Sequence, residues 1–592
     1  INKIISDDNR FTEVQNWMKK TGTNEEVLKF KLTNDGYTKG EFNSLLALKN
    51  RGDIPDVISM PWMQKFKEIF SEQRNFDIKD KTAFQCVIEP IISYASIQCD
   101  TYFSSISVER KNVLDIRALK NSILKNIEEK IVSFTIKPVV LEMNIANLRN
   151  ELEGDNPEEK FISFIHNSLS STQQVLHFLS EYPVLARRLV ELTDKSLNHH
   201  FKVINRFIND ISEIQETLIP ITSSLIDIQV DAGDTHNGGQ TVTILTFDNL
   251  HKLVYKPRSL SVDSQFQELL KWCNRMGFKL KFSTLKMIDK DHYGWQECIS
   301  YTECDTKEDV ENFYYRLGGY ISILYSLNAI DFHFENLIAQ GQHPYLIDLE
   351  SIFHPLQPMS EQSTAQHQAM KLLMTSVLGT GLLPIHHKTA KDSPLEVSGI
   401  GGDEGQVISN IEYLKNDNTS NMKIEKTQTH IESRANRPKY KGKAVNPVGY
   451  VSSVLEGFES MYSIFMDNKE DVLGKNGILA PFLNTTTRFI VRNTELYARF
   501  IQMGKHTDYL QSGLDQQRLI DLMWNYGRIS KNHLKIIPSE INDLLQGDIP
   551  YFYTKPNSTI IWDSNNQEIH GFLEKSGQEL VFHKIDSLSQ ED

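Results

Sequence analysis

The sequence predicts an α+β fold with a large helical region at its N-terminal end and paired strands further along. Residues 1 to about 225 repeat apolar side chains at three- and four-residue spacing, most clearly over 182–218, as amphipathic helices do. From about residue 226, two β-rich runs at 241–247 and 252–256 are separated by a polar turn, which predicts a hairpin. A chain of 592 residues is long enough for several domains around a large core.

The composition favours a soluble globular protein and argues against a nucleic-acid enzyme or a membrane-spanning protein. Apolar residues make up 40% of the chain and charged residues 24%, which is ordinary for a soluble globular protein. The formal net charge of −14 argues against a nucleic-acid enzyme, although it leaves room for a local basic groove. No apolar run approaches membrane-spanning length and the first residues lack the apolar core of a signal peptide, so we expect a cytoplasmic protein without a membrane span.

Cysteines and adjacent histidines give little indication of a metal centre. The cysteines form no CxxC pair and are predicted to be reduced, mostly buried thiols; they are Cys86, Cys99, Cys273, Cys298 and Cys304. His199 and His200 would face different directions on a helix, so we expect exposed or capping side chains rather than a metal pair.

The most informative stretch runs from residue 331 to 350. It places Asp331, His333 and Asn336 ahead of two short apolar runs and Asp348. An Asp followed five residues later by an Asn, then by a hairpin and a second Asp, is the pattern of a protein-kinase catalytic loop. Asp331 would accept the proton of a hydroxyl nucleophile, and Asn336 and Asp348 would supply hard oxygen ligands to Mg²⁺. His333 is expected to contact the transferred phosphoryl group.

Two simpler interpretations of this loop stay open: a polar surface loop, or a metal site of another kind. The predicted hairpin, with strands at 337–340 and 344–347, and the Asp that follows it favour the kinase interpretation.

Lys256 ends the second run of the first hairpin. In kinases a strand lysine at this place pairs the α- and β-phosphates of ATP, so Lys256 is the predicted nucleotide lysine. A solvated edge lysine would be the simpler interpretation without the downstream loop. Glu268, on the predicted helix that follows, is a candidate ion-pair partner for Lys256.

No GxGxxG or Walker-type motif occurs in the chain, so the phosphates need another cover. The loop GDTHNGGQT at 233–241 is the candidate, because its glycines permit a tight turn. Asp234 and His236 could reach from this loop into the site.

The second half of the chain is predicted to continue as the larger part of such an enzyme. Residues 307–328 indicate a helix that leads into the 331–350 stretch, and 360–440 is rich in glycine and polar residues, which favours loops or an inserted lid. We therefore expect three regions, at 1–225, 226–305 and 306–592.

Residues 485–501 carry several arginines. If this segment is helical, Arg488 and Arg492 lie one turn apart and form a fork for phosphate; the alternative is an amphipathic helix with solvated arginines. Residues 547–553, GDIPYFY, predict a turn into a short aromatic strand.

Six motifs, in this order and spacing, resemble the dehydratase domain of class II lanthipeptide synthetases, the LanM type. They are GDTHNGGQTVTILTF, LVYKPRSL, DFHFENLIAQGQHPYLIDLESIF, GTGLLP, RFIVRNTELYA and GDIPYF. The segment EYPVLARRL resembles the helical N-terminal region of that family, so the resemblance covers nearly the whole chain. It implies a lipid-kinase-like two-lobed core with a large N-terminal helical region and an inserted activation element.

The resemblance also implies a reaction and its site residues. Ser and Thr of a precursor peptide would be phosphorylated with ATP and Mg²⁺, and phosphate would then be eliminated to give dehydroalanine and dehydrobutyrine. The catalytic loop would comprise Asp331, His333 and Asn336, with Asp348 as the metal aspartate. Lys256 would serve nucleotide and phosphopeptide, Asp234 and His236 would form the pair before the hairpin, and Arg488 and Thr494 would serve elimination.

This chain departs from the family pattern at two places. Arg492-Asn493-Thr494 stands where the family often has Arg-Pro-Thr, and no cysteine follows Cys304 to build the zinc site of the family's C-terminal cyclase. We therefore expect a truncated synthetase or a stand-alone dehydratase that works with a separate cyclase. The alternatives are a peptide kinase without elimination, and a nucleotide- or leader-binding module without chemistry.

Overall fold

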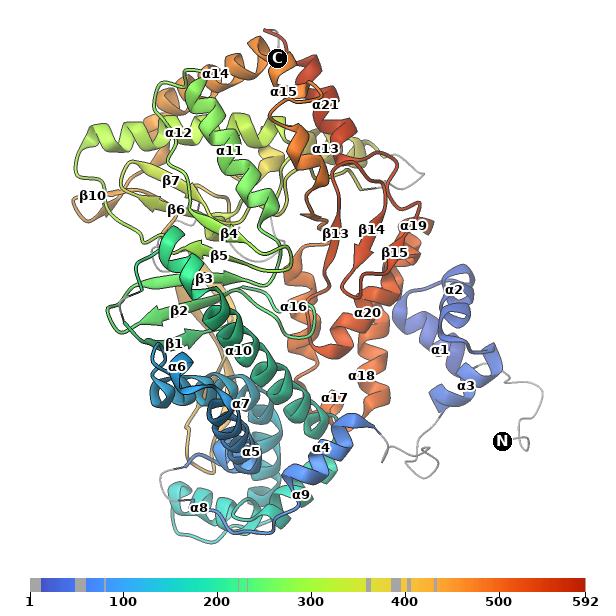
Figure 1. Ribbon diagram of the computed structural model, residues 1–592. Coiled ribbons are helices and arrows are strands. Elements are labelled where there is room, and N and C mark those ends of the chain that lie inside the picture. The colour runs from blue at the N-terminus through green and yellow to red at the C-terminus, as the bar shows by residue number, and fades with distance from the viewer. Residues whose placement is uncertain are drawn as a thin grey trace.

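The computed structural model describes residues 12–47, 60–78, 81–221, 223–230, 233–357, 364–384, 396–401, 406–430 and 434–590. Within these ranges the chain forms many helices around five small sheets (Figure 1). The predicted boundaries at 225 and 305 stay predictions.

Ten helices precede the first strand in the described ranges. They are α1 (Thr12–Thr21), α2 (Glu25–Asp35), α3 (Lys39–Ala47), α4 (Pro61–Ile69), α5 (Ala83–Ser105), α6 (Val108–Lys111), α7 (Ile116–Leu148), α8 (Pro157–Ser168), α9 (Thr172–Glu181) and α10 (Pro183–Thr217). Local sequence sets their starts: Thr82 and Gln85 form a capping box ahead of α5, and Asp115 caps α7. Helix α10 begins at Pro183, whose missing N–H costs nothing at the first helical position.

Helix α7 is, among the described residues, the one helix long and apolar enough to cross a membrane by length and composition. This finding differs from the expectation that no apolar run approaches membrane-spanning length. Ile123, Ile127 and Ile131 of α7 are buried in a core shared with α5 and α10. Of the most apolar 18-residue window of α7, 33% is buried inside the protein.

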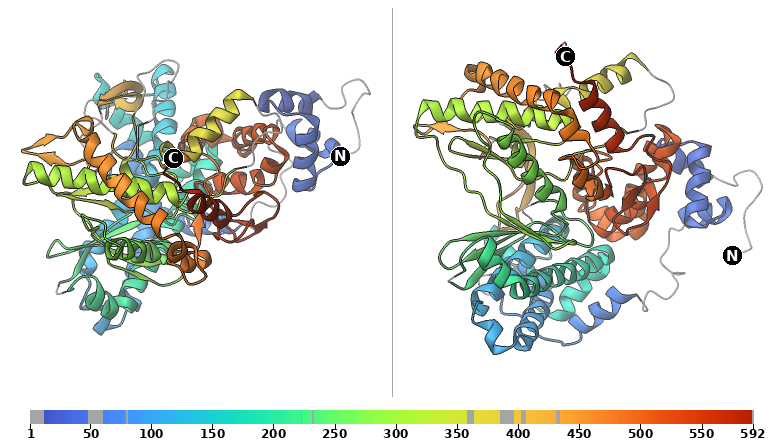
Figure 2. Two further views of the ribbon diagram at one scale, coloured as in Figure 1. Left: turned by 90° about the horizontal axis from the view of Figure 1, so that it is seen from above. Right: turned by 45° about the horizontal axis from the view of Figure 1, so that its top comes forward.

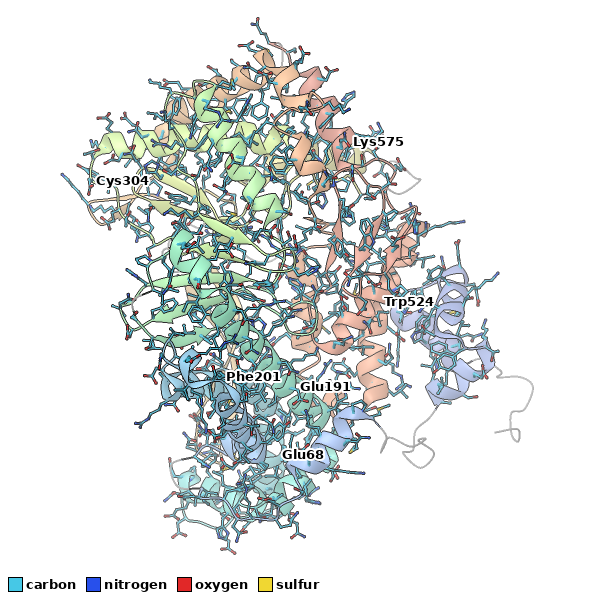
Figure 3. The ribbon with its side chains drawn as sticks, in the orientation of Figure 1. Glu68, Glu191, Phe201, Cys304, Trp524 and Lys575 are labelled. Carbon is cyan, nitrogen blue, oxygen red and sulfur yellow. The ribbon has the colours of Figure 1, made fainter. Side chains whose placement is uncertain are left out.

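The first three helices lie apart from α5 to α10 and beside the C-terminal helices in both views of Figure 2. Trp17 Nε1 donates a hydrogen bond of 2.9 Å to Asp521 Oδ2, and Lys31 Nζ lies 3.3 Å from Asp521 Oδ1. The Lys31 ammonium also lies 5.5 Å from the ring centroid of Trp524, which is labelled at this contact in Figure 3. The buried Asp521 is therefore the polar anchor of an apolar interface.

We expect Asp521→Ala to destabilise this interface by about 2 kcal/mol, because it leaves the Trp17 N–H without its acceptor and removes one of the two carboxylates that pair with the buried Lys31 ammonium. Calorimetry should show a lower melting temperature. Asp35→Ala is the matched control, since Asp35 also pairs with Lys31, at 2.7 Å, but lies nearer to solvent. An equal loss in both variants would contradict the assignment of Asp521 as the anchor.

The largest sheet has five strands in the order β1-β2-β3-β5-β4. The strands are β1 (Leu225–Gln229), β2 (Thr243–Phe247), β3 (Lys252–Lys256), β4 (Met287–Asp289) and β5 (Gly294–Glu297). The predicted β2–β3 hairpin is confirmed, with Thr243 opposite Tyr255. Strand β1 was not predicted. Helix α10 packs against this sheet: Arg206 donates to the Tyr255 hydroxyl, and Asp210 accepts from the Trp295 indole at 2.8 Å.

The prediction that His199 and His200 are exposed or capping is wrong. Both lie in α10 where it is covered on two sides, and they are 4% and 0% exposed. His199 Nε2 lies 2.8 Å from the Thr243 hydroxyl, and His200 Nδ1–H donates to the Ser196 carbonyl at 2.7 Å. Burial lowers the pKa of His199 to about 3, so the ring is neutral and serves packing.

The part that carries the predicted catalytic loop is built on α11 (Ser261–Arg275), α12 (Lys307–Ser326) and α14 (Val451–Asp467), with the hairpin β6 (Leu337–Gln340) and β7 (His343–Leu346). The helix predicted at 307–328 and this hairpin are confirmed. Helices α12 and α14 cross closely: a Cβ on Gly318 would lie 1.9 Å from the Val454 carbonyl oxygen. Only glycine fits there.

The inserted region at 360–440 contains regular elements where loops were the simplest expectation. They are α13 (Ala365–Thr375), η4 (Val377–Thr380) and the long hairpin of β8 (Val407–Lys415) and β9 (Lys423–His430). The turn of this hairpin reaches the helical region, where Ser420 N–H donates to the Pro157 carbonyl at 2.9 Å. The glycine-rich segment SGIGGDEG at 398–405, part of this predicted loop region, lies partly outside the described residues.

A second sheet, with the order β12-β13-β14-β15, and several short helices complete the chain. The remaining elements are η3 (Phe334–Asn336), β10 (Lys439–Tyr440), β11 (Lys443–Ala444), η5 (Pro447–Tyr450), α15 (Lys469–Leu473), η6 (Ala480–Asn484), β12 (Thr487–Arg488), α16 (Thr494–Met503), α17 (Thr507–Gln511), α18 (Gly513–Ile520), η7 (Asp521–Arg528), α19 (Lys531–Leu534), α20 (Ile537–Gln546), β13 (Phe552–Thr554), β14 (Ile561–Asp563), β15 (Glu568–Ile569) and α21 (Gly577–Ser587). The aromatic strand predicted after Gly547 is β13. All five cysteines are free thiols, and four are buried.

Candidate active site

Three of the predicted site residues meet at the peptide groups of Ile347. Hairpin pairing of β6 with β7 brings Asn336 beside Ile347, whose N–H donates to the Asn336 carbonyl at 3.0 Å. Lys256 Nζ, from the end of β3, donates to the Ile347 carbonyl at 2.5 Å. Asp348 follows directly in the chain. The large sheet and the β6–β7 hairpin thus bring Lys256, Asn336 and Asp348 together.

Asp331 begins a tight loop in front of this hairpin. Its backbone has a left-handed conformation with φ of +69°, which is uncommon for aspartate, and its carbonyl accepts the side-chain N–H of Asn336 at 2.7 Å. This bond directs the Asn336 amide and leaves its oxygen available as a ligand. His333 is half-buried, and its Nδ1 accepts the Glu335 N–H at 3.3 Å.

The Asp331 carboxyl has a raised pKa. Its side chain is partly open to solvent, but the protein atoms around it disfavour the charged form, and Asp348 and Glu350 add negative charge nearby. The charges of His333 and Arg488 oppose this rise. A carboxylate with a raised pKa is a better proton acceptor than an ordinary one.

Arg258 forms the centre of a charge network that the sequence analysis missed. Its guanidinium donates to Asp263 at 2.6 and 3.2 Å and to Asp348 at 2.8 Å, and its Nε lies 3.0 Å from Glu350. Arg258 stands two residues beyond Lys256, and Glu350 stands two residues beyond Asp348. This short distance from predicted site residues is the one sequence feature that could have indicated both.

The predicted partner of Lys256 is wrong. Glu268 is exposed and pairs with Lys271 at 2.7 Å, whereas Asp263, one turn earlier on α11, lies 3.6 Å from Lys256 Nζ. Asp263 is 1% exposed, so it serves both Lys256 and Arg258 inside the protein.

Asp348 remains ionised in this network. Burial would raise its pKa, but the charges of Arg258, Lys256 and Arg488 outweigh burial and hold the pKa below the usual range. Its side chain keeps 36% of its area exposed, so a ligand can still reach a carboxylate oxygen.

Arg488 joins this network from the second sheet, but Arg492 and Thr494 do not. Arg488 lies in β12 and donates to Glu350 Oε1 at 2.8 Å. The helix predicted over this segment begins only at Thr494, so Arg488 and Arg492 form no fork. Arg492 instead pairs with the fully buried Glu540 at 2.6 Å. Within the described residues no hydrogen bond joins the Thr494 side chain to Arg488.

The loop at 233–241 is held by Asp548 of the GDIPYF motif. The N–H groups of Gly238 and Gly239 donate to its carboxylate at 3.1 and 3.0 Å, so these amides are already engaged by an anion. That this loop covers the phosphates stays a prediction. His236 Nδ1–H donates to the Ile549 carbonyl at 2.7 Å. Asp234 is exposed, and no contact in the described part of the chain links its side chain to the network.

His236 lies beside Tyr551, with ring centroids 5.2 Å apart. Burial and the charge of Arg488 lower the pKa of His236 to about 3, so the ring is neutral and its Nε2 carries the lone pair.

Asp543 supports Tyr551 from α20 and should make stability depend on pH. Burial raises the pKa of its carboxyl from 3.8 to about 6. Because the folded-state pKa is raised, this group's contribution to stability is complete below about pH 4 and is lost as the pH rises through about 6, a change of about 3 kcal/mol. We expect Asp543→Asn to become more stable relative to the unmodified protein as the pH rises over this range. Thermal unfolding across the range tests this, and a constant difference would contradict it.

The family described as "Domain of unknown function (DUF4135)" matches residues 182–555. The chain belongs to this family. The match begins at α10 and includes every residue of the charge network, so the DUF4135 region is the part that holds the candidate site.

The chain is also similar to an individual protein, the lacticin 481/lactococcin biosynthesis protein LcnDR2 of Lactococcus lactis subsp. lactis. The two are 28% identical over 483 residues, which are 78% of this chain and 50% of that protein. The chain thus spans about half the length of this relative. These matches confirm the resemblance that the sequence motifs indicated.

Proposed function

We propose that this chain dehydrates a precursor peptide in lanthipeptide maturation, by phosphorylating Ser and Thr with ATP and then eliminating phosphate. The convergence of Lys256, Asn336 and Asp348 at Ile347, with Arg488 joined to the same network, is the observation that carries this proposal. The similarity to a lacticin 481/lactococcin biosynthesis protein supports it. We further propose a lipid-kinase-like two-lobed core, with the five-stranded sheet in the small lobe.

In the phosphorylation step, the Asp331 carboxylate takes the proton of the Ser or Thr hydroxyl. The hydroxyl oxygen forms a bond to the γ-phosphorus of ATP while the bond to the β-phosphate oxygen breaks, releasing ADP. Lys256 places positive charge beside the phosphates, and its fixed position at Ile347 orients it. His333, at the open side of the loop, contacts the transferred group.

Asn336 and Asp348 fit a magnesium ion, because an amide oxygen and a carboxylate are hard oxygen donors. Within the described residues no cluster of three or more His, Cys, Asp or Glu side chains could hold a metal. An ion at this place would take its remaining ligands from phosphate and water, as Mg²⁺ usually does. When bound, it would neutralise charge on the phosphates.

In the elimination step, the Cα–H proton passes to a base, a Cα=Cβ double bond forms, and the Cβ–O bond breaks. The electron pair of that bond leaves with phosphate. Arg488 supplies the positive charge that stabilises the departing dianion. The products are dehydroalanine from Ser and dehydrobutyrine from Thr.

The intact mass of a Ser/Thr-rich precursor peptide, after incubation with the protein, ATP and Mg²⁺, tests the proposal. We expect the loss of one water per modified residue, with ADP and phosphate released. A stable gain of phosphate would limit the function to a peptide kinase. ATP binding without any mass change in the cognate peptide would favour a binding module.

A further inference from the structure

Glu350 connects Arg258, two residues beyond the end of β3, with Arg488 in β12. Its Oε1 accepts from Arg488 at 2.8 Å, its Oε2 lies 3.0 Å from Arg258 Nε, and its backbone carbonyl accepts the Arg488 N–H at 2.7 Å. The residue is 9% exposed. Both carboxylate oxygens are therefore committed to guanidinium groups in a nearly dry environment, where such bonds are strong.

The two arginines depend on Glu350 to different degrees. Arg258 keeps two other carboxylates, Asp263 with two bonds and Asp348 with one. For Arg488, Glu350 is the one carboxylate that the described part of the chain places within ion-pair distance. Loss of the Glu350 charge would thus leave Arg258 held by two carboxylates and Arg488 without an ion-pair partner among the described residues.

Tyr551 is the other group that fixes the Arg488 side chain. The Arg488 guanidinium lies over the Tyr551 ring, 5.5 Å from its centroid. The ring is held in turn by the backbone, because Tyr551 N–H donates to Asp543 at 3.4 Å and the next residue begins β13. A carboxylate and an aromatic face together define where the guanidinium points.

We propose that Glu350 and Tyr551 are positioning residues for Arg488 in the elimination step, an inference that rests on the proposed function. They act through Arg488 and not on the peptide. Elimination should therefore depend on them more strongly than phosphorylation, for which Asp331, Asn336 and Asp348 keep their contacts.

The test uses Glu350→Gln in the full chain, with phosphorylation of the precursor and elimination from purified phosphopeptide measured separately by mass. We expect elimination to slow by at least about 30-fold and phosphorylation by less than about 5-fold, so that phosphopeptide accumulates. Glu495→Gln is the matched control, because it removes the carboxylate of an exposed Glu–Arg pair, with Arg499 at 2.5 Å.

The coupling to Arg488 is tested by the double variant Glu350→Gln/Arg488→Ala. If Glu350 acts through Arg488, the double variant eliminates phosphate no more than about twofold slower than Arg488→Ala alone. Tyr551→Phe keeps the ring face and should eliminate at least about tenfold faster than Tyr551→Leu. Melting temperatures of all variants separate these effects from loss of folding.

Two outcomes would overturn the inference while leaving the function in place: equal slowing of both steps by Glu350→Gln, or additive effects in the double variant. Failure of the unmodified protein to phosphorylate the precursor or to release phosphate would overturn the proposed function itself, and the inference with it.

Discussion

Replacing Asp348 with asparagine is expected to abolish phosphate transfer to the precursor peptide, with a loss of about 10³-fold or more. The substitution keeps the shape of the side chain but removes the negative charge that the surrounding cations hold in its ionised form. Folding should survive, because Arg258 keeps its bonds to Asp263 and Glu350. Transfer of labelled γ-phosphate measures the effect directly.

Asp515→Asn provides the control for this substitution. It changes an aspartate that pairs with Arg518 at 2.8 Å on the surface helix α18. Phosphate transfer should be unchanged in this variant, since exposed pairs contribute little. Phosphate transfer at a normal rate by Asp348→Asn would contradict the assignment of Asp348 as a magnesium ligand. Asn336 would then be the one proposed oxygen ligand left.

Replacing Arg488 with alanine is expected to stop the reaction at the phosphopeptide. Elimination should slow by about 10²- to 10³-fold, because the leaving phosphate loses the cation that stabilises its charge. Phosphorylation should change much less, since Arg488 contacts neither Lys256 nor Asn336 through any hydrogen bond in the described residues. The ratio of phosphorylated to dehydrated peptide in a time course measures the difference.

Arg488→Lys separates charge from geometry. Lysine keeps the positive charge but cannot hold Glu350 and a phosphate with one planar fork, so we expect only partial recovery of elimination. Equal loss of phosphorylation and elimination in Arg488→Ala would contradict the assignment of Arg488 to elimination and of the residues around the β6–β7 hairpin to phosphorylation. Thr494 stays a predicted elimination residue, although the structure gives it no bond to Arg488.

The sequence predicted those parts of the site that depend on short spacing. The loop before β6 carries Asp331 and Asn336, and Asp348 lies just after β7. The apolar runs of β6 and β7 were enough to identify that hairpin in the sequence. Lys256 could be placed because it ends a recognisable strand. Hairpin register then fixes the contact of Asn336 with Ile347 without any information from distant residues.

The missing parts depend on contacts between distant segments. The Glu350–Arg488 bond and the Asp548 bonds to the 233–241 loop join residues that lie far apart in the chain, and no local pattern specifies them. The same reason explains the errors. His199 and His200 look exposed in the sequence but are covered once α10 packs on the sheet.

The anchoring of the first helices at Asp521 sets an order for synthesis of the chain. Residue 17 leaves the ribosome about 500 residues before residue 521, a delay of roughly half a minute to two minutes at ordinary rates of translation. During that time Trp17 and Phe42 can pack on each other, but their neighbours from η7 and α20 are still missing. The core around α10, in contrast, is formed mostly by residues that precede β6, with Met422 and Leu510 as later members. The apolar face of these first helices is therefore completed only after η7 and α20 have been synthesised.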